Sequence, residues 1–123
     1  MTTDKTGAQV AVADNPAALR YEISVQSDSG PVAAGLTAYR DREADGTPQR
    51  VFFHTEVAEE FGGRGLGTIL VREALDDTRA RGQIIVGVCP LVAAFLKKNP
   101  DYEPATAPVT PEVLAWLKKT LGD

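Results

Sequence analysis

The sequence predicts an α/β fold, with a mixed sheet that is antiparallel in its N-terminal part, a parallel β-α-β core and flanking helices. Three observations lead to this prediction. Runs rich in β-branched and aromatic residues alternate with turn-forming residues in the first half of the chain. Four glycines then fall within residues 62–67, and apolar residues at helical spacing follow them at once. A short, almost wholly apolar run comes directly after that helix, as in a strand buried on both faces.

The N-terminal half is expected to hold three strands. The first alternates apolar and polar side chains, the second is weaker because it is rich in Ala and Gly, and the third is the most strongly β-forming. These strands are predicted at residues 21–25, 32–40 and 50–57. Between the second and third strands, the charged stretch 41–49 contains Gly46 and Pro48 and is expected to be a surface hairpin loop.

The glycine-rich segment is expected to open a helix and then a buried strand. The helix ends at Gly82, a residue type suited to the position just past a helix C-terminus. Residues 83–88 are nearly all apolar and predict a strand. Because a helix joins the two strands, we expect residues 83–88 to run parallel to residues 50–57 through a right-handed crossover.

Two further helices are predicted after this core. Pro90 suits the first turn of a helix over residues 91–98, with Cys89 near its N-cap. A proline-rich linker follows, and Thr110 with Pro111 then begins a last short helix that carries an apolar stripe. The stripe packs either on the domain or on a partner, and the sequence leaves both possibilities open.

Length and composition indicate one domain. Residues 1–18 are small, polar and without sustained periodicity, so we expect a disordered or loosely attached segment ahead of a domain over residues 19–123. The formal net charge is −4 and no basic block is present, which argues against a nucleic-acid partner. No apolar run approaches the ~18 residues of a membrane-spanning helix, so no membrane partner is expected.

The cysteine and histidine counts bound the compartment and the metal chemistry. A single cysteine cannot form an intramolecular disulfide and fits a reducing compartment, and no secretory signal pattern is present at the N-terminus, so we expect a cytoplasmic protein. One histidine and one cysteine argue against a structural zinc site, and no metal is expected. We expect a monomer or a weak homodimer; the sequence does not separate the two.

A strand, a glycine loop and a helix together can hold a phosphate, because glycines admit a close backbone approach and a helix N-terminus favours an anion. Two nucleotide-binding patterns fail on the residues present. A Walker A loop requires Gly-Lys-Ser/Thr, whereas Leu66 follows Gly65. The dinucleotide fingerprint requires a third glycine, and Leu70 or Thr68 occupies that position, depending on where the count begins.

The remaining pattern resembles the coenzyme A loop of the GNAT superfamily of N-acetyltransferases, Gln/Arg-x-x-Gly-x-Gly/Ala. Gly65 and Gly67 match its two small positions, and Gly62 departs from the Gln or Arg at its start. The stretches that flank the loop are similar to the short single-domain branch of that superfamily. They are His-Thr-Glu-Val at residues 54–57, the Cys-Pro turn within residues 88–95, and Asn-Pro-Asp-Tyr at residues 99–102. The resemblance covers about residues 21–102.

This resemblance implies an N-acetyltransferase that uses acetyl-CoA and transfers the acetyl group to an amine by direct attack in a ternary complex. The amine is a small molecule or a protein lysine, and the acidic net charge slightly favours a cationic acceptor. The pyrophosphate of coenzyme A is expected on the N–H groups of residues 63–68. The implied cofactor contacts are Val57, Ala58, Gly62, Gly63, Arg64, Gly65, Leu66, Gly67, Thr68, Cys89, Asn99 and Tyr102.

Three residues are candidates for catalysis. Strand alternation places His54 and Glu56 on one face, opposite Phe53, Thr55 and Val57, and this pair could accept the proton of the attacking amine. Cys89 either contacts the cofactor or the acetyl group, or acts as a thiolate eased by a helix N-terminus. The resemblance also suggests a backbone N–H for the thioester carbonyl, from Val57 or Ala58.

Roles outside catalysis remain open for the same residues. His54 and Cys89 each have an ordinary structural interpretation, and Tyr102 is either a donor near the thioester sulfur or a packing residue on the second short helix. The chain lacks long loops that could build a substrate pocket, so a non-catalytic coenzyme A or acyl-CoA binding module is a rival. A third possibility is an interaction domain in which the glycine loop is only a turn.

Overall fold

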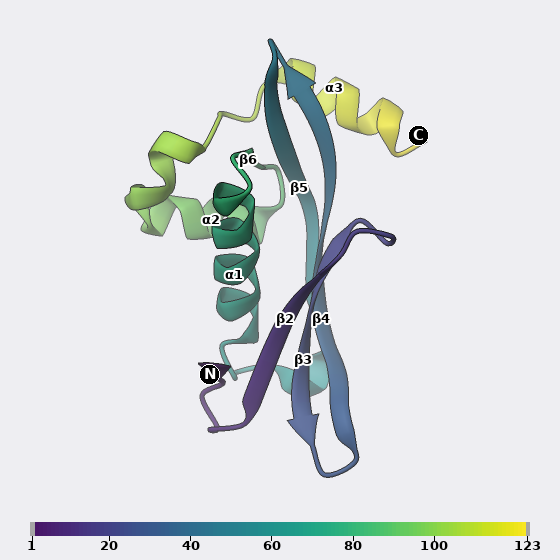
Figure 1. Ribbon diagram of the computed structural model, residues 1–123, viewed down its shortest axis with the longest axis vertical. Helices are drawn as coiled ribbons and strands as arrows, with labels where there is room; N and C mark the ends of the chain where they lie inside the picture. The colour runs from purple at the N-terminus through teal and green to yellow at the C-terminus, as the bar shows by residue number, and fades with distance from the viewer. Residues whose placement is uncertain (1, 123) are drawn as a thin grey trace.

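The computed structural model describes residues 2–122, which form one six-stranded sheet with three α-helices and two short 3-10 helices (Figure 1). Neighbouring strands pair in chain order and are antiparallel, except that β5 and β6 are parallel. The strands are β1 Thr2–Thr3, β2 Gln9–Asn15, β3 Arg20–Ser27, β4 Gly30–Ala44, β5 Thr47–Val57 and β6 Ile84–Gly87. The helices are η1 Glu59–Phe61, α1 Leu66–Ala80, α2 Pro90–Lys98, η2 Pro100–Ala105 and α3 Pro111–Thr120. The predicted α/β fold with its mixed sheet is confirmed.

The N-terminal segment is part of the sheet, so the expectation of a disordered or loosely attached lead-in over residues 1–18 is wrong for its described part. β2 pairs with β3 from Val10 to Asn15, and Val10 is buried opposite Val25. The alternation in β2 is short and relies on small alanines, which is why it gave no clear strand pattern. The backbone hydrogen bonds between β2 and β3 hold this strand in the sheet, although its small side chains bury little apolar surface.

The β4–β5 hairpin is longer than predicted, and the expected loop over residues 41–49 is mostly strand. Only Asp45 and Gly46 form the turn, with φ angles of 55° and 81°. A two-residue turn with both φ values positive matches the twist of antiparallel strands, so the ladder continues to the tip (Figure 1). The charged side chains there lie on the sheet, and Arg42 pairs with Glu112 of α3.

The two faces of the sheet have separate cores. The helix face, covered by α1 and α2, holds the larger core, which includes Tyr21, Tyr39 and Phe52 together with the buried side of α1. The outer face is covered by α3 at one end, where Val113 and Leu117 pack on neighbouring strands (Figure 1). This answers part of the question that the sequence left open, because Val113 and Leu117 of the apolar stripe pack on the domain, whereas Leu114 and Leu121 are exposed.

A β-bulge in β5 decides which side chains reach which face. Tyr39 of β4 pairs with Phe52, and its neighbour Ala38 pairs with His54, so Phe53 is an extra residue in β5. Phe53 packs on the outer face with the α3 core rather than on the helix face. The predicted alternation is therefore wrong for Phe53. Beyond the bulge, Thr55 lies on the helix face, and the side chains that alternate with it point outward.

Candidate active site

An opening between β5 and β6 lies at the centre of the site. The two strands pair only as far as Phe52 and Gly87, whereas β5 continues to Val57. The N–H groups of Val88 and Cys89 both donate to the Phe52 carbonyl oxygen at 2.9 Å, and this shared bond turns the chain away from β5. Pro90 then begins α2. The last residues of β5, 53–57, therefore have no neighbouring strand on this edge.

The backbone groups along that free edge follow from the pairing with β4. The Ala58 N–H donates to the Ala34 carbonyl oxygen at 2.8 Å, so Ala58 cannot be the predicted donor to a thioester carbonyl. Backbone groups alternate in direction along a strand, so those of Val57 and Thr55 point to the opening. Of the two predicted donors, Val57 remains.

The glycine loop presents the start of α1 to the same region. Gly63 and Gly65 both have a φ of 78°, a conformation that favours glycine, and Gly65 is the N-cap. The first helical hydrogen bond runs from the Ile69 N–H to the Gly65 carbonyl. The N–H groups of residues 66–68 therefore have no hydrogen-bond partner within residues 2–122. The Gly62 N–H is bonded to the Glu59 carbonyl oxygen, and it lies outside the predicted N–H donors of residues 63–68.

The first turn of α1 fits tightly beside the opening. A Cβ atom on Gly67 would lie 3.3 Å from the Leu91 side chain and 3.8 Å from that of Val57. A larger residue would push α1 away from α2 and from the end of β5. Gly67 therefore brings the free N–H groups of α1 next to the free edge of β5, as the small position of the loop pattern requires.

A cavity of about 330 Å³ lies between α1 and α2, next to these N–H groups. Thr68, Leu91 and Asn99 line it, and two cations that sequence reasoning missed, Arg72 and Lys98, line it as well. The spacing of Thr68 and Arg72, four residues apart on one helix, was the signal that could have found Arg72. The Asn99 amide donates to the Phe95 carbonyl at 2.8 Å and so closes the end of α2 while its side chain borders the cavity.

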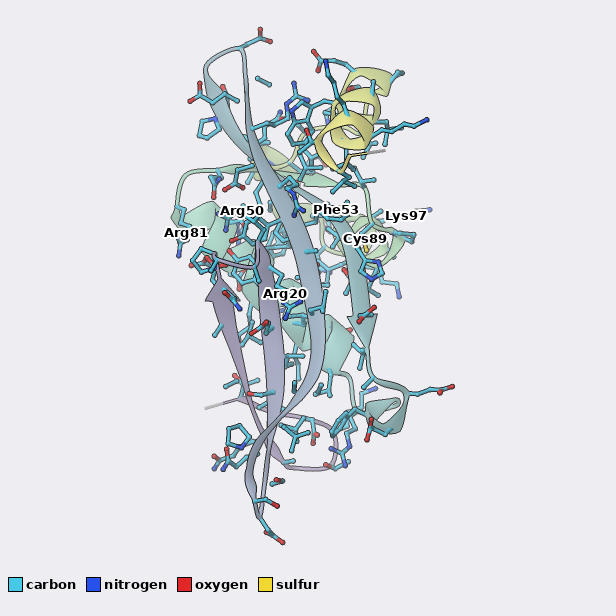
Figure 2. The ribbon with its side chains drawn as sticks, turned by 90° about the vertical axis from the view of Figure 1, so that its right-hand side faces the viewer. Arg20, Arg50, Phe53, Arg81, Cys89 and Lys97 are labelled. Atoms are coloured by element: carbon cyan, nitrogen blue, oxygen red, sulfur yellow. The ribbon has the colours of Figure 1, made fainter. Side chains whose placement is uncertain are left out.

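Cys89 lies under β5 on the helix face and is buried, with 3% of its surface exposed. Its Sγ donates to Thr55 Oγ1 at 3.1 Å, and Thr55 Oγ1 lies 2.8 Å from Thr37 Oγ1. Figure 2 shows Cys89 at the level of Phe53, where β5 and β6 separate. The thiol thus borders the opening and belongs to a chain of hydroxyl groups in the sheet. The two threonines were not among the predicted site residues, because only strand pairing brings them together.

His54 and Glu56 lie on the outer face, as the alternation predicted. His54 Nε2 and Glu56 Oε2 are 3.0 Å apart, and the two side chains are 55% and 62% exposed. Cys89 bonds to Thr55 on the other face of the same strand. The three predicted catalytic residues are therefore divided by β5, with the thiol on the helix face and the His–Glu pair outside.

A shallow groove of about 420 Å³ adjoins the outer pair. It is lined by Glu56, by the end of β5 at Val57 and Ala58, and by Glu22 and Leu36 of the neighbouring strands. The groove and the β5–β6 opening share Val57. The end of β5 is thus accessible to one ligand from the helix side and to another from the outer face.

Two predicted cofactor contacts are engaged elsewhere. The Tyr102 hydroxyl donates to Asp76, and its ring packs edge-on against Phe95. Burial and then the Asp76 hydrogen bond raise the pKa of Tyr102 to about 12. Asp76 lies more than two helical turns beyond the loop, so the structure corrects the sulfur-donor interpretation and supports the packing interpretation. Arg64, which is among the implied cofactor contacts, lies over the Phe61 ring and 3.5 Å from the buried Asp4 carboxylate.

No group of three or more His, Cys, Asp or Glu side chains within residues 2–122 could hold a metal ion. No helix of the described chain is long and apolar enough to cross a membrane.

Known structures share this fold. A GCN5-like protein from Staphylococcus aureus, solved by NMR, is similar at a TM-score of 0.57 with 19% identity, over 82% of this chain and 91% of that chain. A ribosomal-protein-alanine N-acetyltransferase from Brucella melitensis is similar at a TM-score of 0.51 with 14% identity, over 84% of this chain and 93% of that chain. No curated protein sequence matches this chain.

A family model supplies the sequence relationship. The model described as GCN5-related N-acetyl-transferase matches residues 20–105, which is more than half of the chain. The matched region contains β5, the glycine loop, α1 and Cys89, so it includes the opening and the free N–H groups described above. The chain therefore belongs to the GCN5-related N-acetyltransferase family.

Proposed function

We propose that this protein transfers the acetyl group of acetyl-CoA to an amine in a ternary complex. The observation that carries the proposal is the position of three unpaired helix N–H groups beside an unpaired strand edge. An anion suits the first feature, and an extended chain of amides suits the second. Coenzyme A carries both, a pyrophosphate and a pantetheine arm, and its thioester supplies the acetyl group.

The phosphate end is assigned to the start of α1. The N–H groups of residues 66–68 are the donors, and Gly63 and Gly65 allow the backbone to come close. A helix N-terminus alone contributes about 1 kcal/mol, so several converging N–H bonds must supply most of the phosphate binding. Arg72 and Lys98 in the adjacent cavity add positive charge for the rest of the nucleotide.

The acyl end is assigned to the β5–β6 opening. Backbone groups of Thr55 and Val57 are free to pair with the amides of the arm, and the Val57 N–H is the donor for the thioester carbonyl. The Cys89 thiol is held by Thr55 at this point, which supports a contact role for Cys89. No covalent step is needed when the amine attacks directly.

The acceptor is assigned to the outer face. His54 is exposed beside Glu56, and imidazole is the side chain best suited to accept a proton near neutral pH. The Glu56 carboxylate lies 3.0 Å from His54 Nε2 and orients the ring. Arg20 also lines this groove and pairs with Glu22 at 2.7 Å, so Glu56 is the wall carboxylate that favours a cationic amine.

The test is a calorimetric titration of acetyl-CoA into the parent protein and two variants, Gly65→Asp and Gly65→Asn. Both side chains are tolerated at positive φ, and they have nearly the same shape, so the pair isolates charge. We expect binding to the parent, weaker binding to Gly65→Asn, and a further loss of at least about tenfold in Gly65→Asp, whose carboxylate faces the pyrophosphate.

Release of free thiol from acetyl-CoA is then measured with a panel of polyamines and lysine peptides, for the parent and His54→Ala. Turnover that His54→Ala slows supports the proposal. Cofactor binding without turnover of any acceptor would instead identify a non-catalytic coenzyme A module. A folded parent that does not bind acetyl-CoA would mean that the glycine loop is only a turn.

A further inference from the structure

The turn between β1 and β2, residues 4–8, packs against the glycine loop and is called the N-terminal turn below. Its Lys5 N–H donates to the Arg64 carbonyl oxygen at 3.0 Å. Thr2 adds a hydrogen bond to Glu73 on α1, at 3.4 Å. Figure 1 shows this end of the chain beside the start of α1. The contact lies outside the region matched by the family model, which begins at residue 20.

Asp4 gives this turn a defined shape. Its side chain is fully buried, and Oδ1 accepts hydrogen bonds from the Thr6 N–H, the Thr6 hydroxyl and the Ala8 N–H at 2.6–3.0 Å. The Thr6 hydroxyl is the main reason that the pKa of Asp4 is below its usual value. A buried carboxylate that accepts three hydrogen bonds holds a loop in one conformation. The backbone of the next residue, Lys5, is therefore fixed in position.

The other Asp4 oxygen explains where Arg64 goes. Oδ2 is buried without a hydrogen bond and lies 3.5 Å from Arg64 Nη1. The Arg64 guanidinium also lies 5.2 Å from the centroid of the Phe61 ring. The one cation within the loop sequence is therefore directed to Asp4. The positive charge of Arg64 is therefore largely balanced by the Asp4 carboxylate.

Lys5, and not Arg64, is the cation whose side chain lies over the start of α1. A Cβ atom on Gly65 would lie 3.2 Å from Lys5 Cε, so the lysine side chain crosses directly over the N-cap of α1. The side chain is exposed, and among residues 2–122 it has no ion pair. It lines a cavity of about 430 Å³ together with Gly65, Thr68 and Ile69. The Lys5 side chain, which has no ion pair among residues 2–122, thus reaches the N-cap of α1, where the free N–H groups of residues 66–68 begin.

We infer that Lys5 is the cation that binds the pyrophosphate of the cofactor. The inference rests on the proposed function and adds a residue from outside the loop. An ammonium group on a flexible stem is a point-charge phosphate ligand, and it complements N–H donors that carry only partial charges. The loop begins with Gly62 where a Gln or Arg side chain is usual, so the N-terminal turn supplies a charge that the loop itself lacks. In a chain of net charge −4, a local cation also offsets repulsion of the anionic ligand.

The test compares Lys5→Ala, Lys5→Arg and the parent, with Lys119→Ala as a matched control on the distant helix α3. Each protein is titrated by calorimetry with acetyl-CoA, with 3′-dephospho-acetyl-CoA and with acetyl-pantetheine, which has no pyrophosphate. We expect Lys5→Ala to bind acetyl-CoA and its dephospho form about tenfold more weakly, because one charge-assisted phosphate bond is lost. Lys5→Arg and Lys119→Ala should stay within about twofold of the parent, since both keep the charge at position 5.

Binding of acetyl-pantetheine should be the same in all four proteins, and the loss in Lys5→Ala should shrink at about 0.5 M salt. A parent that binds acetyl-CoA while Lys5→Ala binds it equally well overturns the role of Lys5 and leaves the proposed function intact. A loss that disappears with the dephospho form overturns the assignment to the pyrophosphate. A parent that does not bind acetyl-CoA overturns both proposals together.

Discussion

Replacement of Arg50 by Met should destabilise the fold by about 3 to 4 kcal/mol. The Arg50 side chain is 6% exposed, and it lies on the helix face of β5, two residues before the strand separates from β6. Its Nε and Nη2 donate to the two carboxylate oxygens of Asp41 at 2.8 and 3.0 Å. Its Nη1 donates to the Tyr21 hydroxyl at 2.7 Å, and its guanidinium carbon lies 3.9 Å from the centre of the Tyr39 ring.

The magnitude follows from how exposed each partner is. Asp41 is 44% exposed, so water can replace much of the lost pair, and this part is worth about 1 kcal/mol. The buried bond to Tyr21 has a charged donor and is worth about 1.5 kcal/mol. Stacking on Tyr39 away from water adds about 1 kcal/mol. Met keeps most of the aliphatic volume, so the cavity left behind is small.

Urea unfolding at pH 7, followed by circular dichroism, measures this change. For a chain of this size the same loss should lower Tm by about 12 °C. Arg20→Met is the matched control, because Arg20 pairs with Glu22 at 2.7 Å but the two side chains are 40% and 38% exposed. We expect that control to lose less than about 1 kcal/mol. Equal losses in the two variants would refute the reasoning that burial determines the energy.

Two further predictions concern pH and backbone packing. Burial, followed by a hydrogen bond to a carboxylate, raises the pKa of Tyr21 and of Tyr102 from 10.0 to about 12, so the free energy of unfolding should fall as pH rises from 10 to 12. In Tyr102→Phe, the free energy of unfolding should fall less steeply between pH 10 and 12. An unchanged pH dependence in this variant would contradict the assignment of the raised pKa to Tyr102. Gly35→Ala should cost about 2 kcal/mol and reduce acetyl transfer, because the new Cβ would lie 2.7 Å from the Glu56 carbonyl oxygen and displace the end of β5. Full activity at parental stability would show that β5 adapts without loss.

The β-α-β core could be predicted because its signals are local. Apolar residues 83–88, the glycines before α1 and Gly82 after it each determine the structure of their own neighbourhood. The predicted strand, helix and parallel pairing were all found. The glycine loop before α1 could be located for the same reason, since φ values of 78° suit glycine at positions 63 and 65.

The rest depended on contacts between distant parts of the chain. The bulge at Phe53 arises from pairing with β4, and no spacing within β5 reveals it. The burial of Asp4 and the position of Lys5 depend on the packing of the N-terminal turn against the glycine loop. The composition of this N-terminal turn resembles that of a disordered tail, so its packing could not be predicted. Tyr102 was given an alternative packing role, but only the structure supplied Asp76 as its partner.

With the extra residue at Phe53, β5 both packs against the helices and presents the exposed His54–Glu56 pair on its other face. Phe52 of β5 faces the helices and belongs to the core, whereas His54 and Glu56 are more than half exposed. Substitutions at such exposed positions usually change stability by no more than about 0.5 kcal/mol. Under the proposed function, the proton-accepting pair at residues 54 and 56 can therefore be substituted while the core stays intact. Variants at these two positions should remain largely folded, so a loss of turnover in them reports on the chemistry and not on the stability of the domain.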